Sequence, residues 1–171
     1  MISEKRTLIN ELAASFRNAL NIDIDIFDIE KTVVEIGGRI DYFDDYLSEE
    51  GVVKTAEGSF IIRIDKNEPE VRRRFSIARE LGHLFMHMQY GNDEWNRVES
   101  GKYQKHPGMY TALEEEANEF SAAFLMPEKR FMEVAMETSD GEFFYPKKIV
   151  EYFDTYEDAV IFRGKSLGLW E

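Results

Sequence analysis

The segment Arg79-Glu80-Leu81-Gly82-His83 differs at one position from His-Glu-x-x-His, a helical pattern in which two histidines one turn apart bind Zn²⁺. In that pattern the glutamate takes a proton from the metal-bound water. The difference falls on the first metal ligand, because Arg79 stands in its place. A guanidinium has no lone pair for a metal, stays protonated, and brings a positive charge to the place of the cation. The chemistry of the segment therefore depends on Arg79.

The residues around this motif predict a helix with one polar face. At about 100° per residue, four polar side chains fall on that face: Arg79, Glu80, His83 and His87. Most other positions of the segment are apolar, which predicts that the helix is buried. Polar side chains on a buried helix need partners, so the face indicates either a functional site or a hydrogen-bonded pair of histidines.

A second segment, residues 114–127, reads Glu-Glu-Glu-Ala-Asn-Glu-Phe-Ser-Ala-Ala-Phe-Leu-Met-Pro, and residues 73–78 lead into the first motif with Arg-Arg-Phe-Ser-Ile-Ala. With the motif helix, these segments resemble the ImmA/IrrE family of metallopeptidases, chiefly bacterial and phage proteins that act on DNA-binding repressors. The resemblance is specific in residues 73–87 and 114–127. It implies a zincin-like fold and, in the family, a zinc cofactor.

The resemblance also implies roles for individual residues. Carried over position by position, it makes Glu80 the general base, His83 the second zinc ligand and Glu114 the third. The adjacent Glu115 and Glu116 compete for the third position. Glu114 is preferred because it lies one helical turn before an alanine, whose small side chain suits close packing between two helices.

Two positions depart from the family pattern, Arg79 and Ser121. Ser121 replaces an alanine, which is a small-for-small exchange. Arg79 removes one of the three protein ligands that a catalytic zinc site uses, so zinc affinity should fall severely and the metal can be absent here. His87 could serve as an accessory ligand in a site shifted along the helix, although Glu80 would then stand in a different place relative to the metal. We expect Arg79 to form an ion pair with Glu114 or a neighbouring glutamate, since a guanidinium matches a carboxylate.

Two functions are compatible with these residues. The first is a metallopeptidase-fold regulator that targets a DNA-binding repressor of a phage or mobile element, an anti-repressor whose hydrolysis is impaired or lost because of Arg79. The alternative is an active zinc endopeptidase that cleaves the repressor, with Arg79 compensated or introduced as an inactivating substitution. Arg79 favours the first.

The charge of the chain argues against a nucleic acid as its direct partner. The net charge is −13, and residues 21–50 hold ten acidic residues against two basic ones. Phosphate contacts need clustered Lys and Arg, so direct binding to nucleic acid is not expected. An acidic surface keeps a protein soluble. If the partner is a basic helix-turn-helix repressor, as the resemblance implies, the same acidic residues would also favour its DNA-reading face. With no cysteine, no leader at Met1 and no apolar run of transmembrane length, we expect a cytoplasmic protein without membrane contact.

Length and hydrophobic periodicity predict one α+β domain over residues 1–171, with a small antiparallel three-stranded sheet packed on the zincin-like motif helix and surrounded by helices. The strands are expected at residues 39–43, 52–53 and 59–65, and the motif helix at 69–90. Further helices are expected at residues 3–20 (capped by Ser3), 26–36, 110–125, 127–137, 146–153 and 157–166.

Two segments of this arrangement have particular expected roles. The polar, turn-rich residues 91–109 are predicted to form a loop, a candidate rim or lid for the site. Residues 146–171 are predicted to contain a helix-turn-helix-like pair. Its basic and acidic residues balance, so it is expected to pack on the motif helix or to hold a protein partner.

Overall fold

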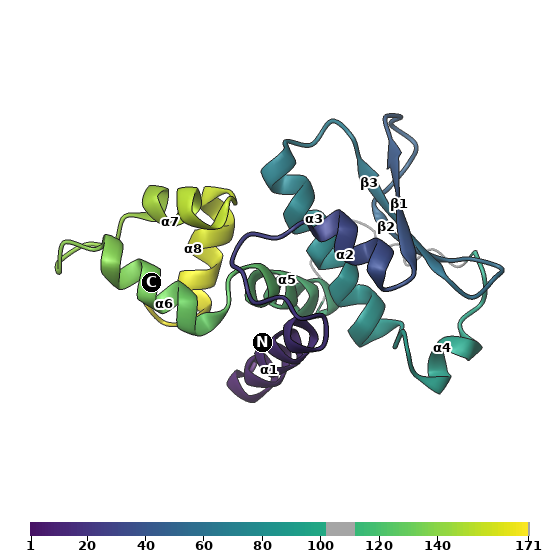
Figure 1. Ribbon diagram of the computed structural model, residues 1–171, viewed down its shortest axis with the longest axis horizontal. Helices are drawn as coiled ribbons and strands as arrows, with labels where there is room; N and C mark the ends of the chain where they lie inside the picture. Colours follow the sequence, from purple (N-terminus) through teal and green to yellow (C-terminus); the bar gives the residue numbers. More distant parts are fainter. Residues whose placement is uncertain (102–111, 171) are drawn as a thin grey trace. The chain divides into compact units, whose positions relative to one another are not determined.

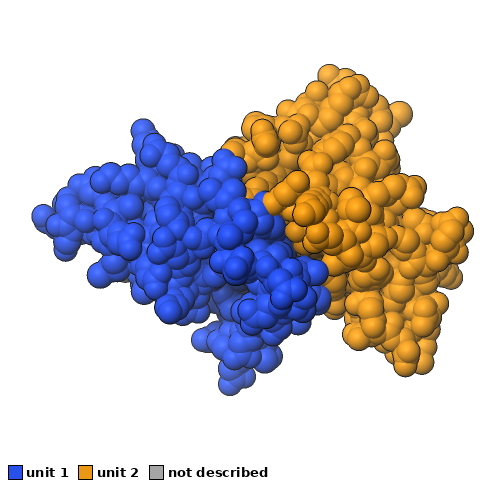
Figure 2. All heavy atoms as spheres, in the orientation of Figure 1, with its two compact units in different colours: residues 1–27, 119–171 blue, residues 28–118 orange. Residues whose placement is uncertain are grey.

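The computed structural model describes residues 1–101 and 112–170. The chain divides into two compact units, distinguished by colour in Figure 2. The sheet unit comprises residues 28–118, and the helical unit comprises residues 1–27 and 119–171. Every residue of the motif helix therefore belongs to the sheet unit. No helix in residues 1–101 and 112–170 has the length and apolar character needed to cross a membrane.

The sheet unit contains three strands, β1 (Gly38–Phe43), β2 (Gly51–Lys54) and β3 (Phe60–Asp65), in the order β1-β3-β2 (Figure 1). The α+β class and the three strands are confirmed. The expectation of a wholly antiparallel sheet is wrong, because β1 pairs with β3 in parallel and only β2 with β3 is antiparallel. The reason is the strand order. Strands β2 and β3 form an antiparallel hairpin, and β3 takes the central position beside β1, with which it runs in parallel.

One face of the sheet packs against helices. In β3 the side chains alternate between buried and half-buried, with Phe60, Ile62 and Ile64 facing the core. Helix α3 (Glu70–Gly82) packs on β3, and the short helix α2 (Ile29–Glu35) contacts β1 and α3. Gly38 is required in β1, since a Cβ atom there would lie 2.3 Å from the Phe60 ring.

The motif helix begins after Pro69, whose fixed φ suits a helix start. Helix α3 continues into a π-helical turn, η1 (His83–His87), where the Met88 N–H donates to the His83 carbonyl at 3.0 Å. The expected helix over residues 69–90 is thus confirmed in its position and its start, but it ends at His87 rather than at residue 90, and its last turn is wider than an α-helical turn. Such π turns are rare and occur often at functional sites.

The predicted loop contains a short helix, α4 (Asp93–Arg97). Residues 102–109 of that loop, and the expected helix start at Tyr110, lie outside the described residues, so the rim or lid stays a prediction. Helix α5 (Ala112–Leu125) follows and is buried through Ala117, Phe120 and Phe124 among others.

The helical unit contains the second half of α5 and, among its described residues, four further helices: α1 (Ser3–Ala19), α6 (Glu128–Thr138), α7 (Pro146–Phe153) and α8 (Glu157–Ser166). The positions predicted for these helices are confirmed to within a residue or two. Ser3 is not a cap, because the N-cap position belongs to Ile2 and carries no side-chain hydrogen bond. Paired aromatic rings fill this core, with Phe16 against Phe120 and Phe131 stacked on Phe153.

A candidate site occupied by an arginine

Arg79 is held by two carboxylates at the position of the missing first ligand. Its Nη2 donates to Glu50 Oε2 at 2.7 Å and to Glu80 Oε1 at 3.1 Å, and its Nε lies 3.3 Å from the same Glu80 oxygen. The expected ion pair of Arg79 therefore exists. Its partner differs from the preferred one: within residues 1–101 and 112–170, the carboxylates bonded to Arg79 are Glu50 and Glu80 rather than Glu114.

Burial sets the protonation of this pair. The Glu80 side chain is 5% exposed, and its burial raises the pKa of Glu80 to about 7, against the opposing pull of Arg79. Burial alone would lower the pKa of Arg79, but the charges of Glu80 and Glu50 outweigh it and raise that pKa. Arg79 therefore stays protonated, and the carboxylate assigned as general base by the resemblance is engaged by a guanidinium.

The two histidines of the polar face lie against each other and against the start of α5. His83 Nδ1 and His87 Nδ1 are 2.8 Å apart, a hydrogen-bond distance. His83 Nε2 lies 3.4 Å from Glu114 Oε1, and His87 Nε2 lies 3.4 Å from Glu116 Oε2. The structure thus brings the three residues with implied roles, Glu80, His83 and Glu114, to one region of the sheet unit. Their assignment as base and zinc ligands stays a prediction.

These donors do not fit a catalytic zinc site. Two ligands of one tetrahedral zinc are about 3.3 Å apart, a separation that His83 Nε2 and Glu114 Oε1 match at 3.4 Å. A third donor is missing from the described part of the chain, where no group of three or more His, Asp or Glu side chains could hold a metal ion. Arg79 cannot supply it, since guanidinium has no free lone pair. The same holds for the shifted site with His87, since no third donor joins His83 and His87 in the described part of the chain.

A cavity of about 390 Å³ opens beside the ion pair. It is lined by six carboxylates, one guanidinium and two other side chains: Glu49, Glu50, Asp65, Glu68, Glu80, Glu114, Arg79, Phe43 and Ser48. Burial raises the pKa of Glu68, which accepts a hydrogen bond from Ser76 Oγ at 2.9 Å. Because six carboxyl groups face a single guanidinium, the cavity suits a cationic group far better than an anionic one.

The loop between β1 and β2 forms one wall of this cavity and displays two apolar side chains. Tyr46 and Leu47 are fully exposed, directly before the lining residue Ser48. The turn is ordered by Asp45, whose carboxylate accepts from the backbone N–H of Leu47 at 3.0 Å and of Ser48 at 2.8 Å. Exposed large apolar side chains beside a polar rim are typical of protein-binding surfaces.

Glu50 is the functional residue that the sequence did not reveal. Its only signal is a pair of adjacent acids, Glu49-Glu50, before the first residue of β2. Such a pair is typical of any polar loop. Only the three-dimensional arrangement brings Glu50 to its partner Arg79, which lies 29 positions further along the chain.

The chain was also compared with known proteins. A model of the IrrE N-terminal-like domain, Peptidase_M78, matches residues 23–163. No curated protein matches the chain. The matched range includes the motif helix, the acidic cavity and the start of α5.

Proposed function

The chain belongs to the IrrE N-terminal-like family of metallopeptidase-fold proteins, and from this we propose that it is an anti-repressor that binds a DNA-binding repressor of a phage or mobile element without hydrolysing it. The observation that carries the proposal is the ion pair of Arg79 with Glu50 and Glu80. It supports loss of hydrolysis, because the first ligand is replaced by a cation and the base is bound to that cation. The remaining cleft is then a binding surface.

The chemistry around the cleft supports a basic helical partner. Six carboxylates line the cavity, and Tyr46 and Leu47 stand exposed at its wall. A DNA-reading helix carries Lys and Arg on one face for phosphate contacts and apolar residues on the other. Such a helix would place its cations in the cavity and its apolar residues against the exposed pair. Binding there would cover the residues with which the repressor contacts DNA, which is how binding alone could relieve repression.

An active zinc endopeptidase remains the second candidate. The observation in its favour is the 3.4 Å separation of His83 Nε2 and Glu114 Oε1, which equals that of two ligands of one zinc ion. This candidate needs a third donor to join that pair and Arg79 to leave the site. It therefore predicts stoichiometric zinc in the purified protein.

The two candidates are separated by one set of measurements. The purified protein is mixed with each purified helix-turn-helix repressor encoded by mobile elements of its own genome. Affinity is measured by titration calorimetry with and without a zinc chelator, repressor length by mass spectrometry, and zinc by elemental analysis. We expect chelator-insensitive binding of one repressor, which keeps its full length.

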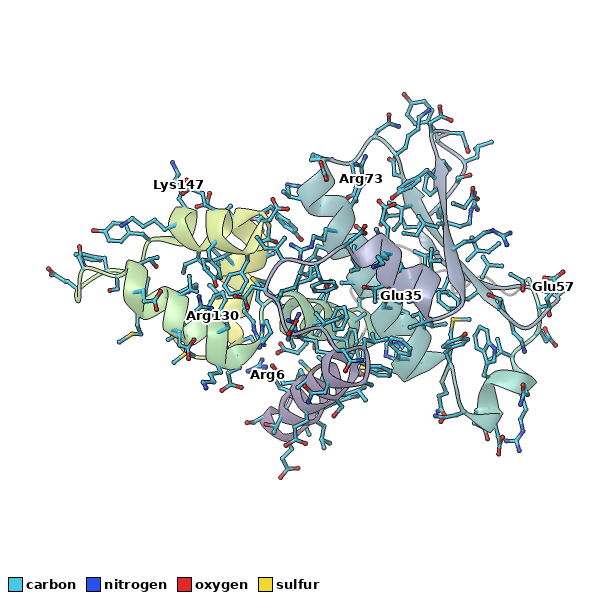
Figure 3. All side chains as sticks on the ribbon, viewed as in Figure 1. Arg6, Glu35, Glu57, Arg73, Arg130 and Lys147 are labelled. Carbon is cyan, nitrogen blue, oxygen red and sulfur yellow. The ribbon has the colours of Figure 1, made fainter. Side chains whose placement is uncertain are left out.

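Charge variants of the acidic loop provide the matched comparison. Glu49→Gln removes a charge from the cavity wall, and Glu57→Gln removes one from an exposed turn elsewhere in the sheet unit (Figure 3). The first should weaken repressor binding several-fold and the second should not. Cleavage of the repressor by the zinc-loaded protein would contradict the anti-repressor proposal and establish the peptidase.

A further inference from the structure

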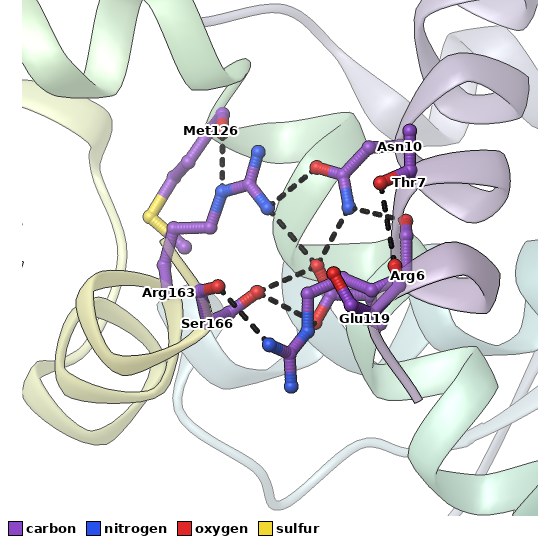
Figure 4. A network of polar contacts seen from close by, with 8 residues as sticks. Arg6, Thr7, Asn10, Glu119, Met126, Arg163 and Ser166 are labelled. Carbon is purple, nitrogen blue, oxygen red and sulfur yellow. Dashed lines mark hydrogen bonds and ion pairs between the residues drawn. The ribbon is translucent and has the colours of Figure 1, made fainter. Parts of the chain in front are cut away.

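A buried carboxylate in the helical unit joins three helices. Glu119 of α5 is completely buried, and it accepts hydrogen bonds from Asn10 Nδ2 at 2.7 Å, from Ser166 Oγ at 2.7 and 2.8 Å, and from Arg163 Nη1 at 3.2 Å (Figure 4). Arg6 Nε of α1 approaches the same carboxylate at 3.6 Å. One negative charge therefore faces two guanidinium groups.

Arg163 is the more deeply buried of these two cations. Its side chain is completely buried, and its Nε and Nη1 donate to the Met126 carbonyl at 3.0 Å and to Asn10 Oδ1 at 2.7 Å. Its Nη2 has no hydrogen-bond partner among residues 1–101 and 112–170. A buried donor without a partner is rare in folded proteins and asks for an explanation. Burial also lowers the pKa of Arg163 to about 10, because Glu119 does not offset the lost hydration.

A cavity of about 610 Å³ lies in contact with this network. Its charged lining consists of four basic and two acidic side chains: Arg6, Arg17, Lys129, Arg163, Glu11 and Glu128. Counting Glu119 behind the wall still leaves one positive charge in excess, whereas the whole chain carries −13. The N-cap residue Pro127 and the first two residues of α6, Glu128 and Lys129, also line it, and the positive end of a helix favours an anion.

We propose that this cavity binds a small organic anion that carries a phosphate or carboxylate group. Guanidinium and ammonium groups are the usual partners of such oxyanions. Lys129 and Arg6 would contact the ligand at the wall, and the buried charge of Arg163 would act on it from beneath with little screening by solvent. A volume of about 610 Å³ is typical of small-molecule sites, which favours an organic anion over a lone inorganic ion. None of these residues lines the acidic cavity, so the proposal stands apart from the proposed function.

The test is a calorimetric titration of the full chain with three probes at constant ionic strength: inorganic phosphate, glycerol phosphate and acetate. Sodium chloride serves as the reference salt. We expect saturable binding of one probe molecule per chain and a rise in melting temperature with its concentration. Preference for the two phosphates over acetate would identify a phosphate-bearing ligand, and the reverse order a carboxylate.

Variants tie the binding to the cavity. Lys129→Ala should weaken binding about five-fold or more, since a charged hydrogen bond contributes on that scale. Lys147→Ala, on the outer side of α7 and outside the cavity lining, should leave it unchanged (Figure 3). Arg163→Gln should abolish binding, and circular dichroism will show whether this buried variant is folded. The proposal is overturned if no probe binds with a dissociation constant below about 10 mM, or if Lys129→Ala and Lys147→Ala bind equally well.

Discussion

Arg79 Nη2 lies 2.7 Å from Glu50 Oε2, so the motif helix is bonded to the loop that precedes β2. In an intact metal-binding motif, the residue at position 79 would instead face the metal. In such a motif a metal cation links the motif helix to the helix that carries the third ligand. Here Arg79 links the motif helix to a loop instead. Its consequences can be measured separately for metal binding, stability and partner binding.

Replacing the arginine by the motif histidine should restore zinc binding. Arg79→His returns the pair of histidines one turn apart, next to Glu114, and completes a three-ligand set. Elemental analysis should find about one zinc per chain in this variant and far less in the original protein or in Arg79→Ala. Adding Glu80→Gln to Arg79→His should leave zinc binding intact and remove any cleavage of a repressor. Stoichiometric zinc in the original protein would contradict the expectation.

The bond between Arg79 and Glu50 should contribute measurably to stability. Both side chains are mostly buried, so Glu50→Gln should lower the free energy of unfolding by about 1–2 kcal/mol. Glu35→Gln removes the partner of Lys31 in an exposed ion pair and should change it by less than about 0.5 kcal/mol. Urea unfolding of the three proteins tests this. Equal effects of the two substitutions would show that the Arg79 pair is no stronger than a surface pair.

Stability should fall as the pH rises from about 4.5 to about 7, owing to Glu80. Burial raises the pKa of Glu80 in the folded protein, so across this range the folded chain keeps a proton that the unfolded chain has released. The loss amounts to roughly 3 kcal/mol at most. Glu80→Gln should flatten this part of the profile in urea unfolding. An unchanged slope in the variant would mean that Glu80 is already ionised at low pH.

The exposed side chains of Tyr46 and Leu47 beside the acidic cavity should contribute to repressor binding and not to the stability of the fold. Leu47→Ser should weaken the proposed repressor complex about ten-fold, because it removes an apolar contact at the cavity wall. Its melting temperature should stay unchanged, since Leu47 buries nothing in the free protein. Leu8→Ser changes an exposed leucine of α1 and is the matched control. Equal affinities for the two variants would remove this loop from the interface.

Gly164 should be irreplaceable in α8. A Cβ atom at this position would lie 1.8 Å from the Trp170 ring, too close for any side chain. Gly164→Ala should therefore lower the free energy of unfolding by about 1–3 kcal/mol. In a Trp170→Ala background the same change should have almost no effect. A full penalty in that background would place the strain in the backbone of α8.

Local features of this fold could be predicted from the sequence. Helices α7 and α8 and the strands β1 and β3 were predicted to within a residue, because their apolar spacing and flanking turn residues act over short distances. The parallel pairing of β1 with β3 could not be predicted from the sequence, since it depends on which strand takes the central position in the sheet. The π-helical turn at His83 was also missed, as nothing in the apolar spacing distinguishes it from an α-helical turn.

The candidate site could be predicted in part. The family motifs identify Glu80, His83 and Glu114, and the structure brings these residues together. The partner of Arg79 could not be predicted, because Glu50 lies on a loop that reaches the helix only through the packing of the sheet. A guanidinium accepts any nearby carboxylate, and the sequence offers many.

Protease cleavage in the turn that Asp45 stabilises should show whether a partner is bound to the chain. Tyr46 and Leu47 protrude from a short connection between two strands, where proteases cut folded proteins most readily. Chymotrypsin, which cleaves after aromatic residues, should nick the free protein after Tyr46 before any buried site. A partner bound against this turn would shield the peptide bond after Tyr46. The rate of cleavage at that bond would therefore fall in proportion to the fraction of molecules in complex.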